Sequence, residues 1–155
     1  SKFSHSNEKA TAGYYSVKLD DDNILAELTT TTRAGFHKYT FTSAGAAHII
    51  LDLKHRDEVI ESSIKMINDH TVVGLSRSKA WANDQYVYFA IEFSVPFKTA
   101  DIWKDEKALT DGRDEHGKNL KDYFSFDKKM VMVKVALSGV SIEGAQRNLA
   151  KELPG

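Results

Sequence analysis

Apolar and polar residues alternate along most of the chain, and turn-forming residues separate the alternating runs. The run at 15–19 reads Tyr-Ser-Val-Lys-Leu, and the run at 36–41 puts His37, Tyr39 and Phe41 on one side. A period of two sends successive side chains to opposite faces of a β-strand, so each run predicts a strand with one buried face. The same pattern predicts strands at 24–32, 47–53, 60–66, 71–77, 86–93, 97–103, 120–126 and 130–137.

Three of these predicted strands carry an almost continuous apolar face. The faces are Ala47, Ile49, Leu51 and Leu53 in the first, Val87, Phe89, Ile91 and Phe93 in the second, and Val131, Val133, Val135 and Leu137 in the third. Removing such rows from water is the main favourable term in folding, so we expect all three to point into the core.

The period lengthens only near the C-terminus. Ser141 is a suitable N-cap for a helix over 142–153, which the final Pro-Gly pair ends. The contact face of this helix is Ile142, Ala145 and Leu149. The sequence therefore predicts a single short helix after the strands.

Segments rich in Asp, Asn, Ser and Gly separate the strands, and these residues favour turns. We expect short connections at 20–23, 43–46 and 68–70. Residues 104–119 form a longer, highly charged segment with two glycines. Long connections of this kind run over the surface, so we predict a mobile loop with a disordered tip.

About nine closely spaced strands without crossover helices between them favour an all-β fold, an antiparallel β-sandwich with a short C-terminal helix. A β-barrel is the alternative architecture. The chain has 155 residues, which fits a single domain over 1–155.

Composition narrows the classes of partner. The chain has 21 basic and 22 acidic residues, a formal charge of -1 and no cysteine. It therefore has no overall field to attract nucleic acid and no thiol chemistry. No apolar run reaches the roughly 18 residues of a spanning helix, and the first residues lack the apolar core of a signal peptide. We expect a processed chain or a piece excised from a larger protein.

Common catalytic and metal-binding motifs are absent from the sequence. None of the six histidines makes a helical zinc pair with glutamate, and the acidic runs at 20–23 and 111–115 lack the spacing of a calcium loop. We interpret His55-Arg56-Asp57 as a local turn ion pair. Glycoside hydrolysis requires two carboxylates about 5 to 10 Å apart, and a pair that meets only in space stays open at this stage.

Two clusters remain as candidate substrate-binding or domain-interface residues. Arg33 and His37 flank a glycine corner, and Trp81 stands close to Asp84 and Gln85. An exposed Trp can stack on a sugar ring while a carboxylate and an amide bind its hydroxyls. The alternative is that Trp81 caps the end of the sandwich or packs on a neighbouring domain. We assign no catalytic residue and no metal ligand.

Several phrases in order resemble the N-terminal domain of glycoside hydrolase family 92, which comprises secreted bacterial exo-α-mannosidases. The main ones are Gly13-Tyr14-Tyr15-Ser16-Val17, Thr32-Arg33-Ala34-Gly35-Phe36-His37, Asp84-Gln85-Tyr86-Val87-Tyr88-Phe89 and Ser141-Ile142-Glu143-Gly144-Ala145. The resemblance runs from one end of the chain to the other. No matching phrase occurs within 104–119.

This resemblance implies a galactose-mutarotase-like supersandwich that packs on a helical catalytic domain of the same polypeptide. The parent enzyme is expected to hydrolyse terminal α-1,2-mannosides of glycans with inversion, in the periplasm or outside the cell. Its catalytic residues and its calcium site are expected in the helical domain, after the terminal helix at 142–153. No cofactor is expected within the chain.

Three hypotheses follow. The preferred one is a non-catalytic, inactive segment that supports the catalytic domain and lines one wall of the sugar site. The alternative is an independent carbohydrate-binding module that uses Trp81 and Gln85. A third is a pure interaction domain, suggested by the terminal helix.

Overall fold

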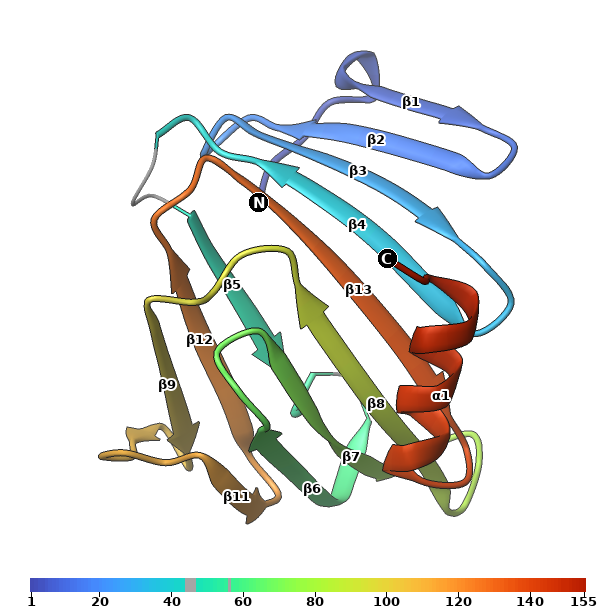
Figure 1. Cartoon of the computed structure of the whole chain (residues 1–155), viewed down its shortest axis with the longest axis vertical. Coiled ribbons are helices and arrows are strands. Elements are labelled where there is room, and N and C mark those ends of the chain that lie inside the picture. Colours follow the sequence, from blue (N-terminus) through green and yellow to red (C-terminus); the bar gives the residue numbers. More distant parts are fainter. Residues whose placement is uncertain (44–46, 56) are drawn as a thin grey trace.

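A computed structural model describes residues 1–43, 47–55 and 57–155 of the protein. It contains two β-sheets and one α-helix (Figure 1). The elements are η1 (His5–Asn7), β1 (Glu8–Thr11), β2 (Tyr14–Leu19), β3 (Ile24–Thr30), β4 (Ala34–Thr40), β5 (Ala47–Asp52), β6 (Glu58–Met66), β7 (Thr71–Lys79), β8 (Gln85–Phe93), β9 (Thr99–Lys104), β10 (Lys107–Ala108), β11 (Asp114–Gly117), β12 (Leu120–Phe126), β13 (Met130–Ser138) and α1 (Ile142–Glu152).

The large sheet has nine strands in the order β1-β2-β3-β4-β13-β8-β7-β6-β11, and the small sheet has four in the order β10-β9-β12-β5. Every described strand pair is antiparallel. Because each sheet ends in edge strands, the predicted sandwich is confirmed and the barrel is wrong. The predicted strand at 60–66 and the hairpin loop at 68–70 are confirmed as well.

The main core lies between the two sheets. Phe93 of β8 contacts Phe124 and Phe126 of β12, with ring centroids 4.9 and 5.2 Å apart. The inward row predicted for β5 and most of the rows predicted for β8 and β13 belong to this core. Leu137 does not, because 47% of its surface stays exposed at the end of β13. The prediction that Leu137 faces the core is therefore wrong.

Helix α1 covers the opposite face of the large sheet (Figure 1). Ala34, Ala90 and Ala136 supply small side chains there, so the helix can approach the sheet closely and bury Ala145 and Leu149. The Ser141 hydroxyl accepts a hydrogen bond from the Gly144 amide at 3.0 Å, which caps the first turn. The predicted helix, its cap and its contact face are all present.

The prediction that 104–119 forms one long loop is wrong, because the segment contains the strands β10 and β11. Strand β10 pairs with β9, and β11 pairs with β6 at the edge of the large sheet. Asp105 and Glu106 make the turn between β9 and β10 with φ of 51° and 63°. Backbone pairing orders this segment, and such pairing leaves no apolar alternation for a pattern search to find.

Two further differences concern boundaries. Strand β1 was not predicted, because Glu-Lys-Ala-Thr has no apolar alternation. Residues 44–46 of the turn expected at 43–46 lie outside the described residues, as does Arg56 of the expected turn ion pair.

Candidate functional site

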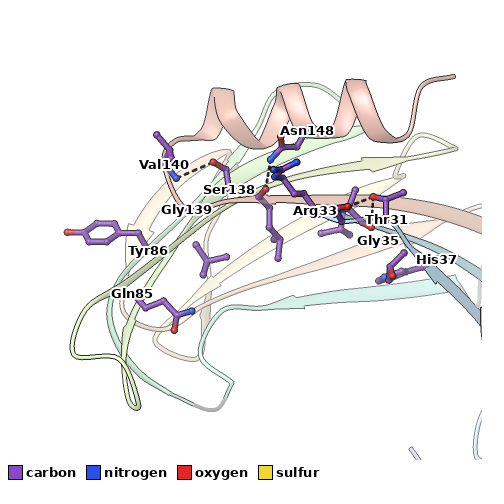
Figure 2. Close-up of a pocket in the computed structure, with 16 residues that line it drawn as sticks. Thr31, Arg33, Gly35, His37, Gln85, Tyr86, Ser138, Gly139, Val140 and Asn148 are labelled. Atoms are coloured by element: carbon purple, nitrogen blue, oxygen red, sulfur yellow. Dashed lines mark hydrogen bonds between the residues drawn. The ribbon is translucent and has the colours of Figure 1, made fainter. Parts of the chain in front are cut away.

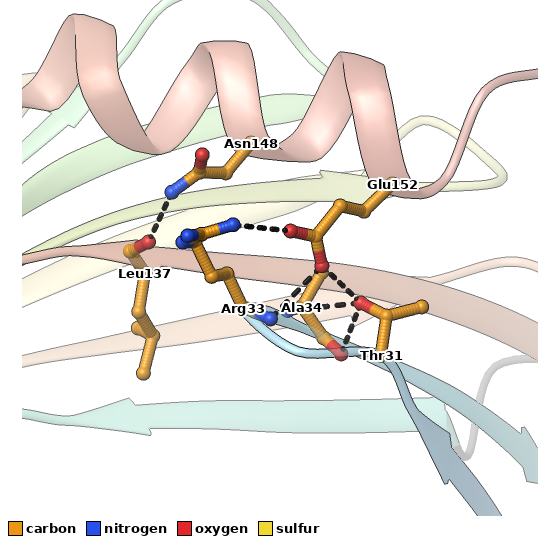
Figure 3. Close-up of polar contacts among 6 residues, drawn as sticks. All are labelled: Thr31, Arg33, Ala34, Leu137, Asn148 and Glu152. Atoms are coloured by element: carbon orange, nitrogen blue, oxygen red, sulfur yellow. Dashed lines mark hydrogen bonds and ion pairs between the residues drawn. The ribbon is translucent and has the colours of Figure 1, made fainter.

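The corner between β3 and β4 is fastened to the C-terminal end of α1 (Figure 3). Glu152 accepts hydrogen bonds from the Thr31 hydroxyl, from the Arg33 backbone amide at 2.9 Å and from Arg33 Nη1 at 3.2 Å. The hydrogen bond from Thr31, followed by those from Arg33, lowers the pKa of the Glu152 carboxyl. The Arg33 charge is thus partly neutralised by a helix residue, and the corner is held in place.

Gly35 has a different role from the one expected. The sequence suggests that it supplies a tight bend between strands, but it lies within β4. A Cβ atom at Gly35 would stand 3.0 Å from Nε2 of His37. The missing side chain therefore makes room for the His37 ring. His37 Nδ1 lies 3.1 Å from the Tyr39 hydroxyl, and burial lowers the pKa of the imidazole.

A hollow of about 830 Å³ opens beside this corner, at one end of the large sheet. We call it the end hollow. Its lining is Thr30, Thr31, Thr32, Arg33, Ala34, Gly35, His37, Gln85, Tyr86, Val87, Val135, Leu137, Ser138, Gly139, Val140 and Asn148. Figure 2 shows Gln85 and Tyr86 toward one end of the view and Gly35 and His37 toward the other. The fold thus brings Arg33, His37 and Gln85 to one cavity although β4 and β8 are far apart in sequence.

Trp81 and Asp84 lie outside this cavity, on the turn between β7 and β8. Both Asp84 oxygens accept hydrogen bonds from Arg77, from Nε at 2.8 Å and from Nη2 at 2.9 Å. These bonds lower the pKa of the Asp84 carboxyl. The Arg77 guanidinium also stacks 4.8 Å from the Tyr86 ring centroid. The carboxylate thus braces the hairpin.

The Trp81 side chain is fully exposed at the tip of the same hairpin, with a relative accessibility of 101%. It therefore does not cap the end of the sandwich, which was one of the two alternatives to sugar stacking. Packing on a neighbouring domain and stacking on a sugar both require an exposed ring, so both remain predictions.

The end hollow presents groups that bind hydroxyls. Its polar lining includes threonine hydroxyls, the Arg33 guanidinium, the His37 imidazole and the Gln85 amide. No carboxylate is among the lining residues that the structure describes. Hydrolysis of a glycoside needs two carboxyl groups across the scissile bond. Across the described ranges, no three His, Asp or Glu side chains come together as a metal site. The cavity is therefore suited to contact a sugar, and it lacks the groups for cleaving one.

Sequence reasoning missed one unusual group, Asp122. It is fully buried on the inward face of β12, and neither carboxylate oxygen has a hydrogen-bond partner. Desolvation, with a smaller contribution from Asp101, raises its pKa to about 7. The nearby backbone amide of Tyr123 offsets a small part of this rise in pKa. It does not meet the geometry of a hydrogen bond, so both oxygens stay unpaired. The sequence does contain a signal for this group, because Asp122 is the one charged residue in the alternating apolar row Leu120, Asp122, Phe124 and Phe126.

The described part of the chain contains no helix with the length and apolar character to cross a membrane. None of the curated proteins compared with the chain matches it. Solved structures do. One is the α-mannosidase BT3965 of Bacteroides thetaiotaomicron, whose structure was solved with mannoimidazole. It matches 100% of this chain with a TM-score of 0.93 and 34% sequence identity.

Two further solved structures are similar. The inverting mannosidase BT2199 of the same organism matches 97% of the chain with a TM-score of 0.84 and 25% identity. The glycosyl hydrolase ccman5 matches 98% with a TM-score of 0.86 and 28% identity. The chain spans only 21% to 23% of the length of the structures named here.

A family model gives the same answer from sequence. The model described as the glycosyl hydrolase family 92 N-terminal domain matches residues 1–138. The matched region contains both sheets and nearly the whole end hollow, so the resemblance seen in the sequence is confirmed. The chain belongs to glycosyl hydrolase family 92, as part of the N-terminal domain of its mannosidases.

Proposed function

We propose that residues 1–155 are a non-catalytic segment of a calcium-dependent, inverting α-1,2-mannosidase. In this proposal the segment supports the helical catalytic domain of the same polypeptide and lines one wall of its sugar site. The observation that carries it is the end hollow, where Arg33, His37 and Gln85 meet without a carboxylate among the described lining residues. A binding wall needs such donors and acceptors, whereas a catalytic centre needs two carboxylates as well.

The surface beside the end hollow supports contact with a protein domain. The Val140 side chain is 81% exposed and that of Leu137 is 47% exposed, and both residues line the hollow. Tyr86 adds an exposed aromatic ring. Apolar and aromatic side chains next to a polar cavity are typical of an interface that closes over a ligand site.

Calcium and the catalytic groups belong, in this proposal, to the helical domain. The described residues offer no cluster of ligands for the ion. The natural substrates are mannose-containing glycans, and the parent enzyme is secreted or periplasmic. BT2199 is named as an inverting mannosidase, which supports the stereochemistry proposed for this protein.

The wall is tested in the polypeptide encoded by the complete reading frame. Gln85→Ala and His37→Ala should each lower kcat/KM on an α-1,2-linked mannobiose about tenfold, the effect of one lost hydrogen bond. Lys18→Ala, on the distant strand β2, serves as the control and should have no effect. Unchanged kinetics in both wall variants would show that the end hollow is not part of the sugar site.

The stereochemistry and the metal are tested with the same enzyme. Proton NMR of the first turnover should show the β-anomer of mannose, and chelation of calcium should abolish the activity. Release of the α-anomer, or full activity without calcium, would contradict the assignment.

The alternative function is an independent carbohydrate-binding module. The fully exposed Trp81, on a hairpin braced by Arg77 and Asp84, favours it, because a rigid exposed ring is a stacking platform. Calorimetric titration of the isolated chain with α-mannosides separates the two functions. Binding that disappears in Trp81→Ala would support the module, and absence of binding would support the wall.

A further inference from the structure

Two aromatic side chains lie together on the outer face of the small sheet. Trp103 of β9 and Tyr123 of β12 have ring centroids 5.7 Å apart, and their ring planes are tilted by 58°. Each of the two residues is 36% exposed, whereas their neighbours Ile102 and Phe124 are buried in the core. Successive side chains of a strand point to opposite faces, so both rings point away from the large sheet. Exposed apolar residues are usually scattered singly, so two large rings in contact indicate a binding surface.

The pairing of β9 with β12 holds the two rings in fixed positions. Tyr123 lies directly opposite Asp101, and Trp103 lies two residues further along the same face of β9. On the other side of β9, strand β10 places Ala108 opposite Trp103. The side chain of Ala108 is too short to cover the indole ring. Because rings on paired strands are held more rigidly than rings on a loop, this pair is suited to bind a ligand.

Hydrogen-bonding groups border the rings on the same face. Asp101 is exposed, and none of the ion pairs within the described ranges involves its carboxylate. The Thr99 and Ser125 hydroxyls lie 2.7 Å apart, two residues beyond Asp101 and Tyr123 on the same two strands. The face thus combines aromatic rings with a carboxylate and a pair of hydroxyls.

This combination of groups fits a sugar. A pyranose ring presents C–H groups that stack on an aromatic ring, and its hydroxyls donate hydrogen bonds to carboxylate and hydroxyl oxygens. Because the two ring planes are tilted by 58°, the rings cannot both lie flat on one planar surface. The geometry therefore suits a soluble, bent oligosaccharide chain rather than the flat surface of a crystalline polysaccharide.

A protein partner fits this face poorly. Stable protein interfaces bury about 800 Å² on each partner, and their centres are depleted in Asp and Lys. Here the exposed large apolar side chains are the two rings and Ile50, which lies opposite Tyr123 on β5. Asp101 and the ion pair of Lys121 with Asp52 border them directly. The apolar area is therefore too small, and the charges are too close, for a second protein or a second copy of the chain.

We propose that Trp103 and Tyr123 form a surface site for a mannose-containing glycan, separate from the end hollow. One sugar unit stacks on Trp103, the next contacts Tyr123, and Asp101 accepts hydrogen bonds from their hydroxyls. None of these three residues lines the end hollow. The site therefore holds a polymeric glycan on the enzyme and takes no part in cleavage. The choice of mannose rests on the proposed function, whereas the stacking site rests on this face alone.

Affinity gel electrophoresis in soluble α-mannan tests the site in the polypeptide of the complete reading frame. Calcium is chelated, so that the proposed hydrolysis does not consume the polymer. Trp103→Ala should raise the dissociation constant for mannan about tenfold, the effect of losing one stacked ring. Trp103→Leu keeps an apolar side chain for folding but has no flat ring, and it should weaken binding equally. Phe3→Ala removes an exposed ring from another part of the chain and should leave the dissociation constant unchanged.

Three results would overturn the surface site. Absence of retention of the unmodified polypeptide would mean that the face binds no mannan. Equal retention of the unmodified polypeptide and both Trp103 variants would mean that mannan binds elsewhere, and a loss confined to Trp81→Ala would identify the hairpin tip as the site.

Turnover of an α-1,2-linked mannobiose, with calcium restored, separates this proposal from the proposed function. Normal turnover without retention on mannan would refute the surface site alone. Retention that depends on Trp103, without any turnover, would refute the proposed activity alone and would support the surface site.

Discussion

Asp122 lies in an inward row between Leu120 and Phe124, where the other side chains are apolar. Its pKa is raised to about 7 in the folded state, above the ordinary value of 3.8. The folded protein therefore binds a proton that the unfolded chain releases, and stability falls as pH rises between about 4 and 7. At pH values above that range, a shift of this size corresponds to a loss of about 4 kcal/mol of unfolding free energy. The group thus makes the folded state less stable at neutral pH.

Asp122→Asn should remove this dependence. The amide carries no charge and, like the protonated carboxyl, is unpaired, so we expect a gain on the order of 4 kcal/mol in unfolding free energy at about pH 8 and almost none at about pH 4. Urea unfolding at both pH values measures it. The exposed Asp127→Asn is the control and should leave the pH dependence unchanged. An unfolding free energy of the natural chain that is flat from about pH 4 to about pH 8 would show that Asp122 is stabilised by some other means.

Gly74 of β7 is the second residue on which the core depends. A Cβ atom there would lie 2.0 Å from the Ser63 carbonyl oxygen and 2.5 Å from Cζ of Phe89. Because one of these atoms belongs to the backbone of β6, the sheet itself would have to move. Gly74→Ala should cost about 3 kcal/mol of unfolding free energy in chemical denaturation. Gly139→Ala, where the added carbon meets no atom within 4 Å, should change it by less than about 0.5 kcal/mol. Equal stability of the two variants would refute this account of β7.

At the scale of elements, Glu152 joins α1 to the corner between β3 and β4. Its pKa is lowered by the Thr31 and Arg33 hydrogen bonds, so its contribution is present above the unfolded pKa and is lost as pH falls through the folded one. Glu152→Gln should lower the melting temperature at neutral pH, and the difference should shrink below about pH 4. Thermal unfolding followed by circular dichroism measures both. A difference that persists unchanged in acid would mean that the charge of Glu152 is not what binds the helix to the corner.

The elements that could be predicted from sequence are those whose side chains face two different environments. Strands β5, β8 and β13 alternate because one face meets the other sheet, and α1 shows its helical period because Ala145 and Leu149 meet the sheet. Strands β1, β10 and β11 lie at sheet edges and are held by backbone pairing, so their charged sequences carry no period. Leu137 was misplaced because the pattern of β13 continues past the end of the core.

At the scale of the whole molecule, the candidate site was predictable only in part. Arg33, His37 and Gln85 could be named from sequence, but their meeting in one cavity depends on β13 lying between β4 and β8. The engagement of Asp84 by Arg77 across the hairpin could not be read from residue types. Local patterns specify strands, whereas the order of strands in a sheet determines which side chains share a cavity.

We propose that this chain is the non-catalytic part of a family 92 mannosidase. The most direct measurement is the turnover of an aryl α-mannoside, with calcium present, by the purified chain and by the polypeptide of the complete reading frame. We expect a folded chain without detectable hydrolysis and a complete polypeptide that hydrolyses the substrate. Calcium-dependent hydrolysis by residues 1–155 alone would contradict it.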